Sequence, residues 1–120
     1  MTNLPPTEHP LPLKNAELHI LLVLARHDAH GYAMMQEVSE RTGGIIRLGP
    51  GTLYTTLKRL VERGWIEEIE APAHATDADD PRRRVYHLTD SGREILAAEV
   101  ERLSRLVAYA SALGMETAAR

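Results

Sequence analysis

Cysteine and phenylalanine are both missing from this chain of 120 residues. Without cysteine there are no disulfides, no thiolate metal ligands and no thiol nucleophile. Only 4% of the residues are aromatic whereas 43% are hydrophobic, so aliphatic side chains must fill the core. The longest dense apolar run, Ile20 to Ala25, is far too short to cross a bilayer. The chain begins without a basic stretch followed by an apolar run, so we expect no secretory signal and a cytoplasmic protein.

Sequence signatures of catalysis are missing as well. The chain has no HExxH, no phosphate-binding glycine loop and no GxSxG. His27, Asp28 and His30 lie close together, but no third histidine is near them, so a solvated helix end is a better interpretation than a metal site. We therefore expect no enzymatic activity, no metal and no cofactor.

Positive charge is scarce overall, because 14 Lys and Arg face 17 Asp and Glu for a net charge of −3. That balance argues against a protein that binds polyanions regardless of their sequence. Site-specific DNA binding remains compatible with it, because local charge governs contact with phosphates. The segment Thr52–Arg63 is locally basic, with Lys58, Arg59 and Arg63 against Glu62.

The most informative segment is LGPGTLYTTLKRLVERGWI, residues 48–66. A Pro-Gly turn starts the expected helix and a glycine ends it. Leu53, Leu57 and Leu60 share one helical face. At about 100° per residue, the opposite face presents Gly51, Thr55, Lys58 and Glu62, with Arg59 close by and Thr52 and Tyr54 on the flanks. Such a helix is typical of a nucleic-acid reader, but also of an ordinary solvated amphipathic helix.

The remaining patterns predict three helices, a β-hairpin and a long helix, in that order. Four of the seven prolines fall in the first 14 residues, which suggests an extended arm. Before the segment at residues 48–66, we expect a helix from Ala16 to His27 with Asn15 as its N-cap, a helix from Tyr32 to Arg41, and a β-prone stretch at Ile45–Leu48. After it come strands at Trp65–Glu70 and Arg82–Leu88 around a turn at residues 71–81, and then a helix capped by Thr89 that runs to Leu113.

This order predicts a mainly α fold with a small β-hairpin, a winged helix-turn-helix followed by a C-terminal dimerisation helix. The expected units are an arm at residues 1–14, a winged-helix domain at 15–88, the dimerisation helix at 89–113 and a tail at 114–120.

The last helix carries an apolar seam with the heptad-like spacing of 4, 3, 4 and 3 residues, namely Leu96, Val100, Leu103, Val107 and Ala110. The alternative is a helix packed back on its own domain. We favour dimerisation because the helix follows a complete small domain that has little face left to cover it.

Read together, four motifs resemble the PadR family of bacterial transcriptional regulators. They are His30-Gly31-Tyr32, then Gly51-Thr52-Leu53-Tyr54 with Leu57, Arg59 and Leu60, then Arg63-Gly64-Trp65-Ile66, and finally Arg82 to Thr89 with Gly92. The resemblance extends over roughly residues 18–107 and points to the smaller subfamily, which has a single C-terminal helix.

The resemblance implies a homodimeric repressor that binds a pseudopalindromic operator, with the third helix in the major groove and the wing near the backbone or minor groove. By position, the candidates for DNA contact are Tyr32, Gly51, Thr52, Tyr54, Thr55, Lys58, Arg59, Arg82, Arg83 and Arg84. Gly51 would allow close backbone approach, and Tyr32 either contacts the DNA backbone or packs under the hairpin. Lys58 and Arg59 could read guanine edges or hold phosphates.

The wing fits this picture less simply, because six acids face three arginines between Glu67 and Arg84. We expect wing contacts with DNA to come from the arginines at its base. Strand alternation places Arg82 and Arg84 on one face and Arg83 on the other. Pairing across the strands with Glu67, Glu68 or Glu70 is the alternative for at least one of them.

The sequence leaves two alternatives, which concern the binding partner and a small-molecule effector. A winged-helix module that binds proteins and not DNA is the main alternative function. Some PadR relatives bind aromatic compounds at the dimer centre, but the C-terminal helix offers only Tyr109 as an aromatic residue, so we identify no small-molecule effector.

Overall fold

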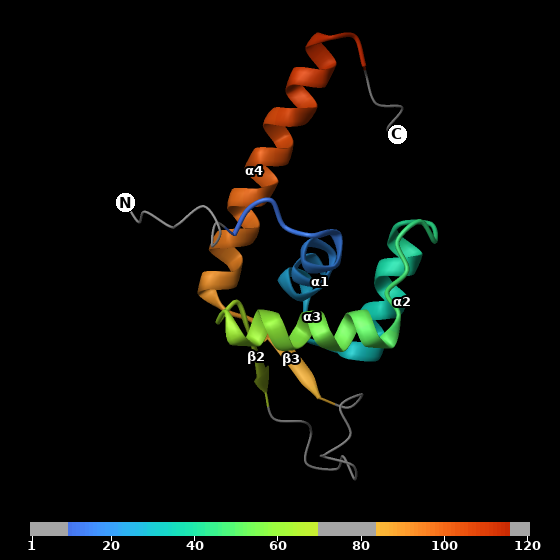
Figure 1. Cartoon of the computed structure of the whole chain (residues 1–120), viewed down its shortest axis with the longest axis vertical. Coiled ribbons are helices and arrows are strands. Elements are labelled where there is room, and N and C mark those ends of the chain that lie inside the picture. Colours follow the sequence, from blue (N-terminus) through green and yellow to red (C-terminus); the bar gives the residue numbers. More distant parts are fainter. Residues whose placement is uncertain (1–9, 70–83, 116–120) are drawn as a thin grey trace.

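The computed structural model describes residues 10–69 and 84–115. Four helices and three short strands follow in the order α1 (Asn15–Arg26), β1 (Ala29–His30), α2 (Gly31–Arg41), α3 (Pro50–Glu62), β2 (Ile66–Ile69), β3 (Val85–Leu88) and α4 (Asp90–Ala112). Figure 1 shows α3 lying across α1, with β2 and β3 below it and α4 extending away from the rest. None of the helices in this described part combines the length and apolar character that crossing a bilayer requires.

The expected fold class is confirmed, with one strand more than the sequence indicated. The sheet has the order β1-β3-β2, and both pairs are antiparallel. Ala29 pairs with Tyr86, so the short segment that breaks the chain between α1 and α2 is itself a strand. As a result β3 is the central strand, and it ties the hairpin to the helices.

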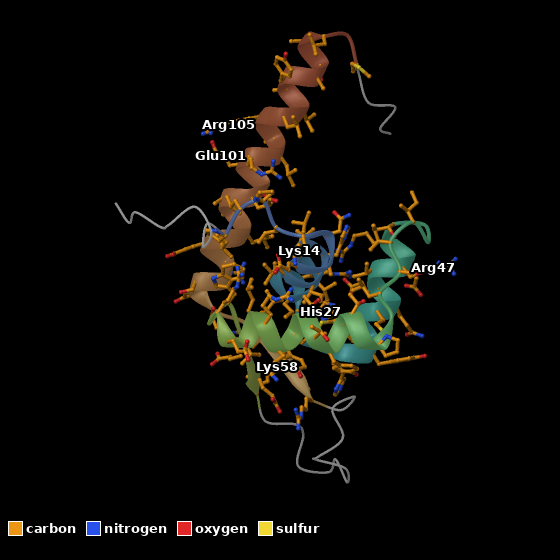
Figure 2. The ribbon with its side chains drawn as sticks, in the orientation of Figure 1. Lys14, His27, Arg47, Lys58, Glu101 and Arg105 are labelled. Atoms are coloured by element: carbon orange, nitrogen blue, oxygen red, sulfur yellow. The ribbon has the colours of Figure 1, made fainter. Side chains whose placement is uncertain are left out.

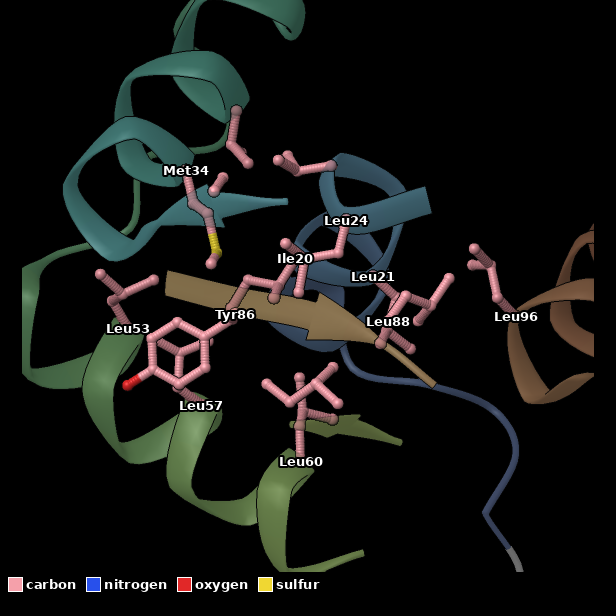
Figure 3. Packing of buried hydrophobic residues seen from close by; sticks show 14 of the residues in the cluster. Ile20, Leu21, Leu24, Met34, Leu53, Leu57, Leu60, Tyr86, Leu88 and Leu96 are labelled. Carbon is pink, nitrogen blue, oxygen red and sulfur yellow. The ribbon is translucent and has the colours of Figure 1, made fainter. Parts of the chain in front are cut away.

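Aliphatic side chains fill the core, as the composition required. α1 supplies Ile20, Leu21, Val23 and Leu24, which are almost completely buried. Leu53, Leu57 and Leu60 of α3 are likewise buried at 0–1% exposure, which confirms the predicted inner face of that helix. Figure 3 shows these leucines gathered around β3, with Tyr86 between the helices and Leu96 of α4 at the edge of the cluster.

Two local predictions are wrong. The N-cap of α1 is Lys14 and not Asn15, because Lys14 has extended backbone angles and its N–H donates to Glu17 Oε1 at 2.9 Å. The β-prone stretch Ile45–Leu48 forms no strand. Its backbone is used by a side chain instead, since the Ile46 N–H donates to Thr42 Oγ1 at 3.0 Å and so closes the turn that follows α2.

The N-cap prediction for the last helix is confirmed. Thr89 Oγ1 accepts the Gly92 N–H at 3.0 Å and donates to the Gly64 carbonyl at 2.6 Å. α4 therefore starts against the turn that ends α3. Residues 1–9 of the expected arm, Glu70 with the turn at 71–81, and residues 116–120 of the expected tail lie outside the described residues.

Candidate nucleic-acid interface

The third helix begins and ends where the sequence predicted. Pro50 occupies the first helical turn after Gly49, where its missing N–H costs nothing. At the other end Gly64 has a positive φ of 78°, and the Trp65 N–H donates to the Leu60 carbonyl at 3.1 Å, which closes the helix. Both ends are thus set by local chemistry, and they define which residues the helix can present.

The outer face of α3 carries the predicted hydroxyl and cationic groups. Thr52, Thr55 and Lys58 are exposed, as is Glu62 one turn later. Figure 2 shows Lys58 on the side of α3 from which the hairpin strands extend. A Cβ atom added at Gly51 would meet nothing within 4 Å, so the backbone at the start of the helix is open to approach.

Two of the candidate residues on this helix lie on its flanks and contact the domain itself. Tyr54 is half-buried and its ring packs against Gly31, where an added Cβ would lie 3.1 Å from Tyr54 Cε1. Arg59 Nη1 lies 3.8 Å from Glu17 Oε2 on α1. The sequence placed both side chains correctly near the edge of the outer face, but it gave no sign of these contacts.

Of the three arginines predicted at the base of the hairpin, Arg84 lies within the described residues, and it forms an ion pair with the neighbouring strand. Its Nε lies 3.3 Å from Glu68 Oε2, so the cross-strand pairing considered for the wing arginines is confirmed for this one. Arg82 and Arg83 lie outside the described residues, as do Asp77, Asp79 and Asp80 of the predicted acidic tip.

A groove of about 400 Å³ runs between α3 and the hairpin. Lys58 and Val61 border it on the helix, Tyr86 borders it on β3, and Arg84 borders it just before that strand. Burial raises the pKa of the Tyr86 hydroxyl, which keeps that group neutral over the ordinary pH range. Glu62 and Glu68 also line the groove, so its two cations are matched by two acids.

Tyr32 lies at the start of α2 and is 55% exposed, rather than packed beneath the hairpin. Gln36 Nε2 donates to its hydroxyl at 3.3 Å, a spacing of one helical turn. The phenol of Tyr32 therefore lies on the solvent side of α2 with its hydroxyl accepting from Gln36.

His27 and Asp28, two of the residues that had suggested a metal site, each pair with a different side chain. His27 Nε2 lies 3.0 Å from Glu37 Oε1, and Asp28 Oδ1 lies 2.7 Å from His87 Nδ1 on β3. A hydrogen bond with the Asp28 carbonyl, followed by the one with Glu37, raises the pKa of His27. Within residues 10–69 and 84–115 no group of three or more metal-binding side chains comes together.

The predicted seam on α4 divides into a buried start and an exposed continuation. Leu96 is only 6% exposed and belongs to the core, whereas Val100 and Val107 are about half exposed, at 47% and 52%. Leu103 and Ala110 are intermediate. Four further large apolar residues are exposed on this helix and just after it, and sequence spacing missed them: Leu106, Tyr109, Leu113 and Met115.

Comparison with known proteins gives a consistent picture. The model of the transcriptional regulator PadR-like family matches residues 20–98. A transcriptional regulator of Mycobacterium tuberculosis is 38% identical over 89 residues, which cover 74% of this chain and 76% of the relative. An uncharacterized 37.1 kDa protein in a transposon of Streptomyces fradiae is 34% identical over 92 residues, but the chain spans only 24% of its length.

Solved structures share the fold. A PadR family transcription regulator from Clostridium difficile superimposes with a TM-score of 0.70 at 23% identity, covering 83% of this chain and 98% of that one. Bacillus subtilis PadR in complex with operator DNA gives a TM-score of 0.62 at 25% identity, covering 74% of this chain and 48% of that chain. The fold described above is therefore a winged helix of a kind that has been solved with operator DNA bound.

Proposed function

The chain belongs to the PadR-like family of transcriptional regulators, and we propose that it is a repressor that binds a pseudopalindromic operator as a homodimer. The observation that carries this proposal is the outer face of α3, where Thr52, Thr55 and Lys58 are exposed above a fully buried leucine face. Bacillus subtilis PadR, which superimposes on this chain, was solved with operator DNA.

The start of α3 suits an anionic backbone for two reasons. The first N–H groups of a helix have no partner within it, and the helix dipole adds positive potential there. The open space at Gly51 allows a phosphate to approach these N–H groups directly. Thr52 and Thr55 then supply hydroxyls for phosphates or base edges farther into the groove.

Lys58 is the leading candidate for a base or phosphate contact among the charged residues of α3. Arg59 is the second, and its contact with Glu17 leaves its guanidinium only partly available, at 36% side-chain exposure. Tyr54 stays in the proposed set as a flanking residue beside the groove. Glu62, one turn beyond Lys58, would repel phosphate and so marks the end of the proposed contact surface.

Tyr32 and the wing would contact the DNA backbone on either side of α3. The exposure of Tyr32 supports its part in this proposal. For the wing we propose Arg82, Arg83 and Arg84, and Arg84 would have to exchange its partner Glu68 for phosphate. That exchange is feasible because a surface ion pair of this kind contributes only about 0–1 kcal/mol.

Dimerisation would use the exposed stretch of α4, from Val100 through Leu103 and Val107 to Ala110. Large apolar side chains half exposed on a helix that extends from its domain are typical of a protein–protein interface. Leu96 would support this surface from the core rather than contact the partner. A two-fold dimer would present two α3 helices to the two halves of a palindrome.

The decisive test is selection from a pool of random-sequence duplex DNA by the purified full chain. We expect enrichment of an inverted repeat, and binding that weakens steeply as salt rises, because phosphate contacts release counterions. Sedimentation analysis of the free protein should give a dimer. Failure to enrich any sequence at any salt concentration would overturn the proposal and favour a winged helix that binds proteins.

Lys58→Ala should weaken binding to the selected duplex while leaving the fold intact. If Lys58 reads a base, specificity should relax by about 1–3 kcal/mol at one position, whereas a phosphate contact predicts a uniform loss across sequences. The control is Lys14→Ala, which alters the only other lysine of the chain, at the N-cap of α1. Equal loss in both variants would show that general charge, and not the face of α3, is responsible.

A further inference from the structure

Two carboxylates are buried where the residues before α1 meet the helices. Glu99 of α4 is 1% exposed and Glu17 of α1 is 4% exposed. Taking a carboxylate out of water is costly unless hydrogen bonds and an opposite charge compensate for it. Each of these groups therefore needs fixed partners, and the proposed DNA and dimer surfaces use neither of them.

Glu99 is held from two sides. Oε2 accepts the backbone N–H of Leu13 at 2.9 Å, across 86 positions of sequence. Arg102 donates through Nε to Oε1 at 2.6 Å and through Nη2 to Oε2 at 3.0 Å, a two-pronged contact. The Arg102 guanidinium and the Leu13 N–H hold the pKa of Glu99 below its usual value, against the opposing effect of burial.

Glu17 is held in a similar way, but by the next residue of the same segment, Lys14, and not by Leu13. Its Oε1 accepts the backbone N–H of Lys14 at 2.9 Å, and its Oε2 lies 3.8 Å from Arg59 Nη1. The carboxylates of Glu99 and Glu17 thus accept hydrogen bonds from the consecutive N–H groups of Leu13 and Lys14. The side chain of Leu13 between them is itself buried at 7% exposure, so this segment has little room to move.

These contacts form a continuous path from the C-terminal helix to the third helix. We call it the carboxylate relay, and it consists of Arg102, Glu99, Leu13, Lys14, Glu17 and Arg59. Only the φ and ψ rotations of Leu13 separate the two N–H groups, and the buried side chain of Leu13 restricts these rotations, so displacement can pass from one to the other. A shift of α4 that moved Glu99 would therefore pull on the segment that Glu17 holds against α3.

We propose that the carboxylate relay fixes the inclination of α4 on its domain and thereby the separation of the two α3 helices in the dimer. Glu99 is then a positioning residue for the spacing of operator half-sites. This inference rests on the proposed function. Beyond Glu99 the helix continues for about 20 Å, at 1.5 Å per residue to Ala112, so a tilt of about 5° at the relay moves its end by roughly 2 Å.

The test compares duplexes that carry the selected inverted repeat with its central spacer unchanged, lengthened by one base pair or shortened by one. The wild-type protein should prefer one spacing. Glu99→Gln keeps the shape and an acceptor for Leu13 but loses the charge, so we expect its preference between spacings to fall by about fivefold or more, the lower end of ordinary couplings between sites. Glu17→Gln should do the same.

The double variant distinguishes a relay from two separate stabilising contacts. If both carboxylates act along one path, the double variant should lose no more spacing preference than the stronger single variant. Glu94→Gln, an exposed change of the same kind on the same helix, is the control and should keep the wild-type preference. Arg102→Lys provides a milder variant if Glu99→Gln fails to fold, because it keeps a positive charge beside Glu99 and loses only the two-pronged contact.

The outcomes separate the two proposals. If the wild-type chain enriches an inverted repeat but Glu99→Gln or Arg102→Lys remains a folded dimer with unchanged spacing preference, the relay does not position α3 and the inference is wrong. An additive loss in the double variant would overturn the shared path. If the wild-type chain enriches no sequence, the proposed function fails first and the inference fails with it.

Discussion

The two halves of α4 differ in what surrounds them. In the first half, Gly92, Leu96 and Glu99 are buried against the sheet, the core and the segment before α1. In the second half, Leu106, Val107 and Tyr109 are more than half exposed although all three are large hydrophobic residues. The packing of a single chain therefore explains the first half, whereas the second half presents an exposed apolar surface of the kind that marks interaction sites.

The largest loss of stability is expected from Gly92→Ala, in the buried first half of α4. An added Cβ would collide with the Trp65 carbonyl oxygen and lie 2.7 Å from Leu88 Cδ1. The backbone cannot retreat without losing the Thr89 cap, so we expect a loss of more than about 3 kcal/mol of unfolding free energy. Urea unfolding at fixed protein concentration measures it. Ser91→Ala, on the exposed neighbour, should stay within about 0.5 kcal/mol of the wild type.

In the open half, Leu103→Glu tests the dimer. We expect the dimer dissociation constant to rise about 30-fold or more, which is the 2 kcal/mol scale of an interface hot spot. The folded monomer should survive, because Leu103 contributes little to the core. Analytical ultracentrifugation over a concentration series gives the constant, and Arg105→Gln, with the same change of charge at an exposed position, is the control. A variant that still dimerises like the wild type would show that this seam is not the interface.

At the boundary between the halves, the ion pair of Glu99 with Arg102 should make the unfolding free energy depend on pH in the acid range. The pKa of Glu99 in the folded protein is lowered, so its contribution is present above the ordinary value of 4.5 and is lost as the pH falls through the folded value. Glu99→Gln lacks this contribution, which we put at about 1.5–3 kcal/mol at neutral pH. Urea unfolding from pH 7 downward should therefore show the two proteins converging in acid. A difference that stays constant with pH would contradict the assignment.

The smallest effect on stability is expected at Gly51 of α3, where an added Cβ has free space around it, unlike at Gly92. Alanine meets no atom there and favours the helix, so Gly51→Ala should raise the unfolding free energy by about 0.5–1 kcal/mol. If a DNA backbone approaches this point, the same variant should bind the selected duplex more weakly. Melting temperature and fluorescence anisotropy measure the two effects. Gain of stability without loss of binding would remove Gly51 from the proposed contact surface.

Local patterns predicted the third helix well because its determinants are local. The Pro-Gly start, the Arg-Gly stop and the spacing of Leu53, Leu57 and Leu60 all lie within the segment itself, and each acts through backbone geometry or burial. The same holds for Thr89, whose partner is three residues away. These features also distinguish the exposed outer face of α3 from its buried leucine face, and the outer face is the main part of the candidate site.

The missed features are contacts between distant positions. β1 has only two residues, too few to show alternation, and it exists because β3 pairs with it. Arg59 was placed on the outer side of its helix, but Glu17 lies 42 positions earlier, so the pattern of α3 alone could not reveal the contact between them. Leu96 has the spacing of the dimer seam and also of a core residue, and only the position of α4 on the domain distinguishes the two.

The central place of β3 in the sheet also has a consequence for the order of folding. Ala29 and Tyr86 are partners although 57 positions separate them, so their pairing closes a large loop with an entropic cost that few early contacts can offset. The helices α1 to α3, which are joined by short connections, should collapse first. The sheet then closes on a surface that already exists, and hydrogen-exchange labelling during refolding should find Tyr86 protected later than Leu57.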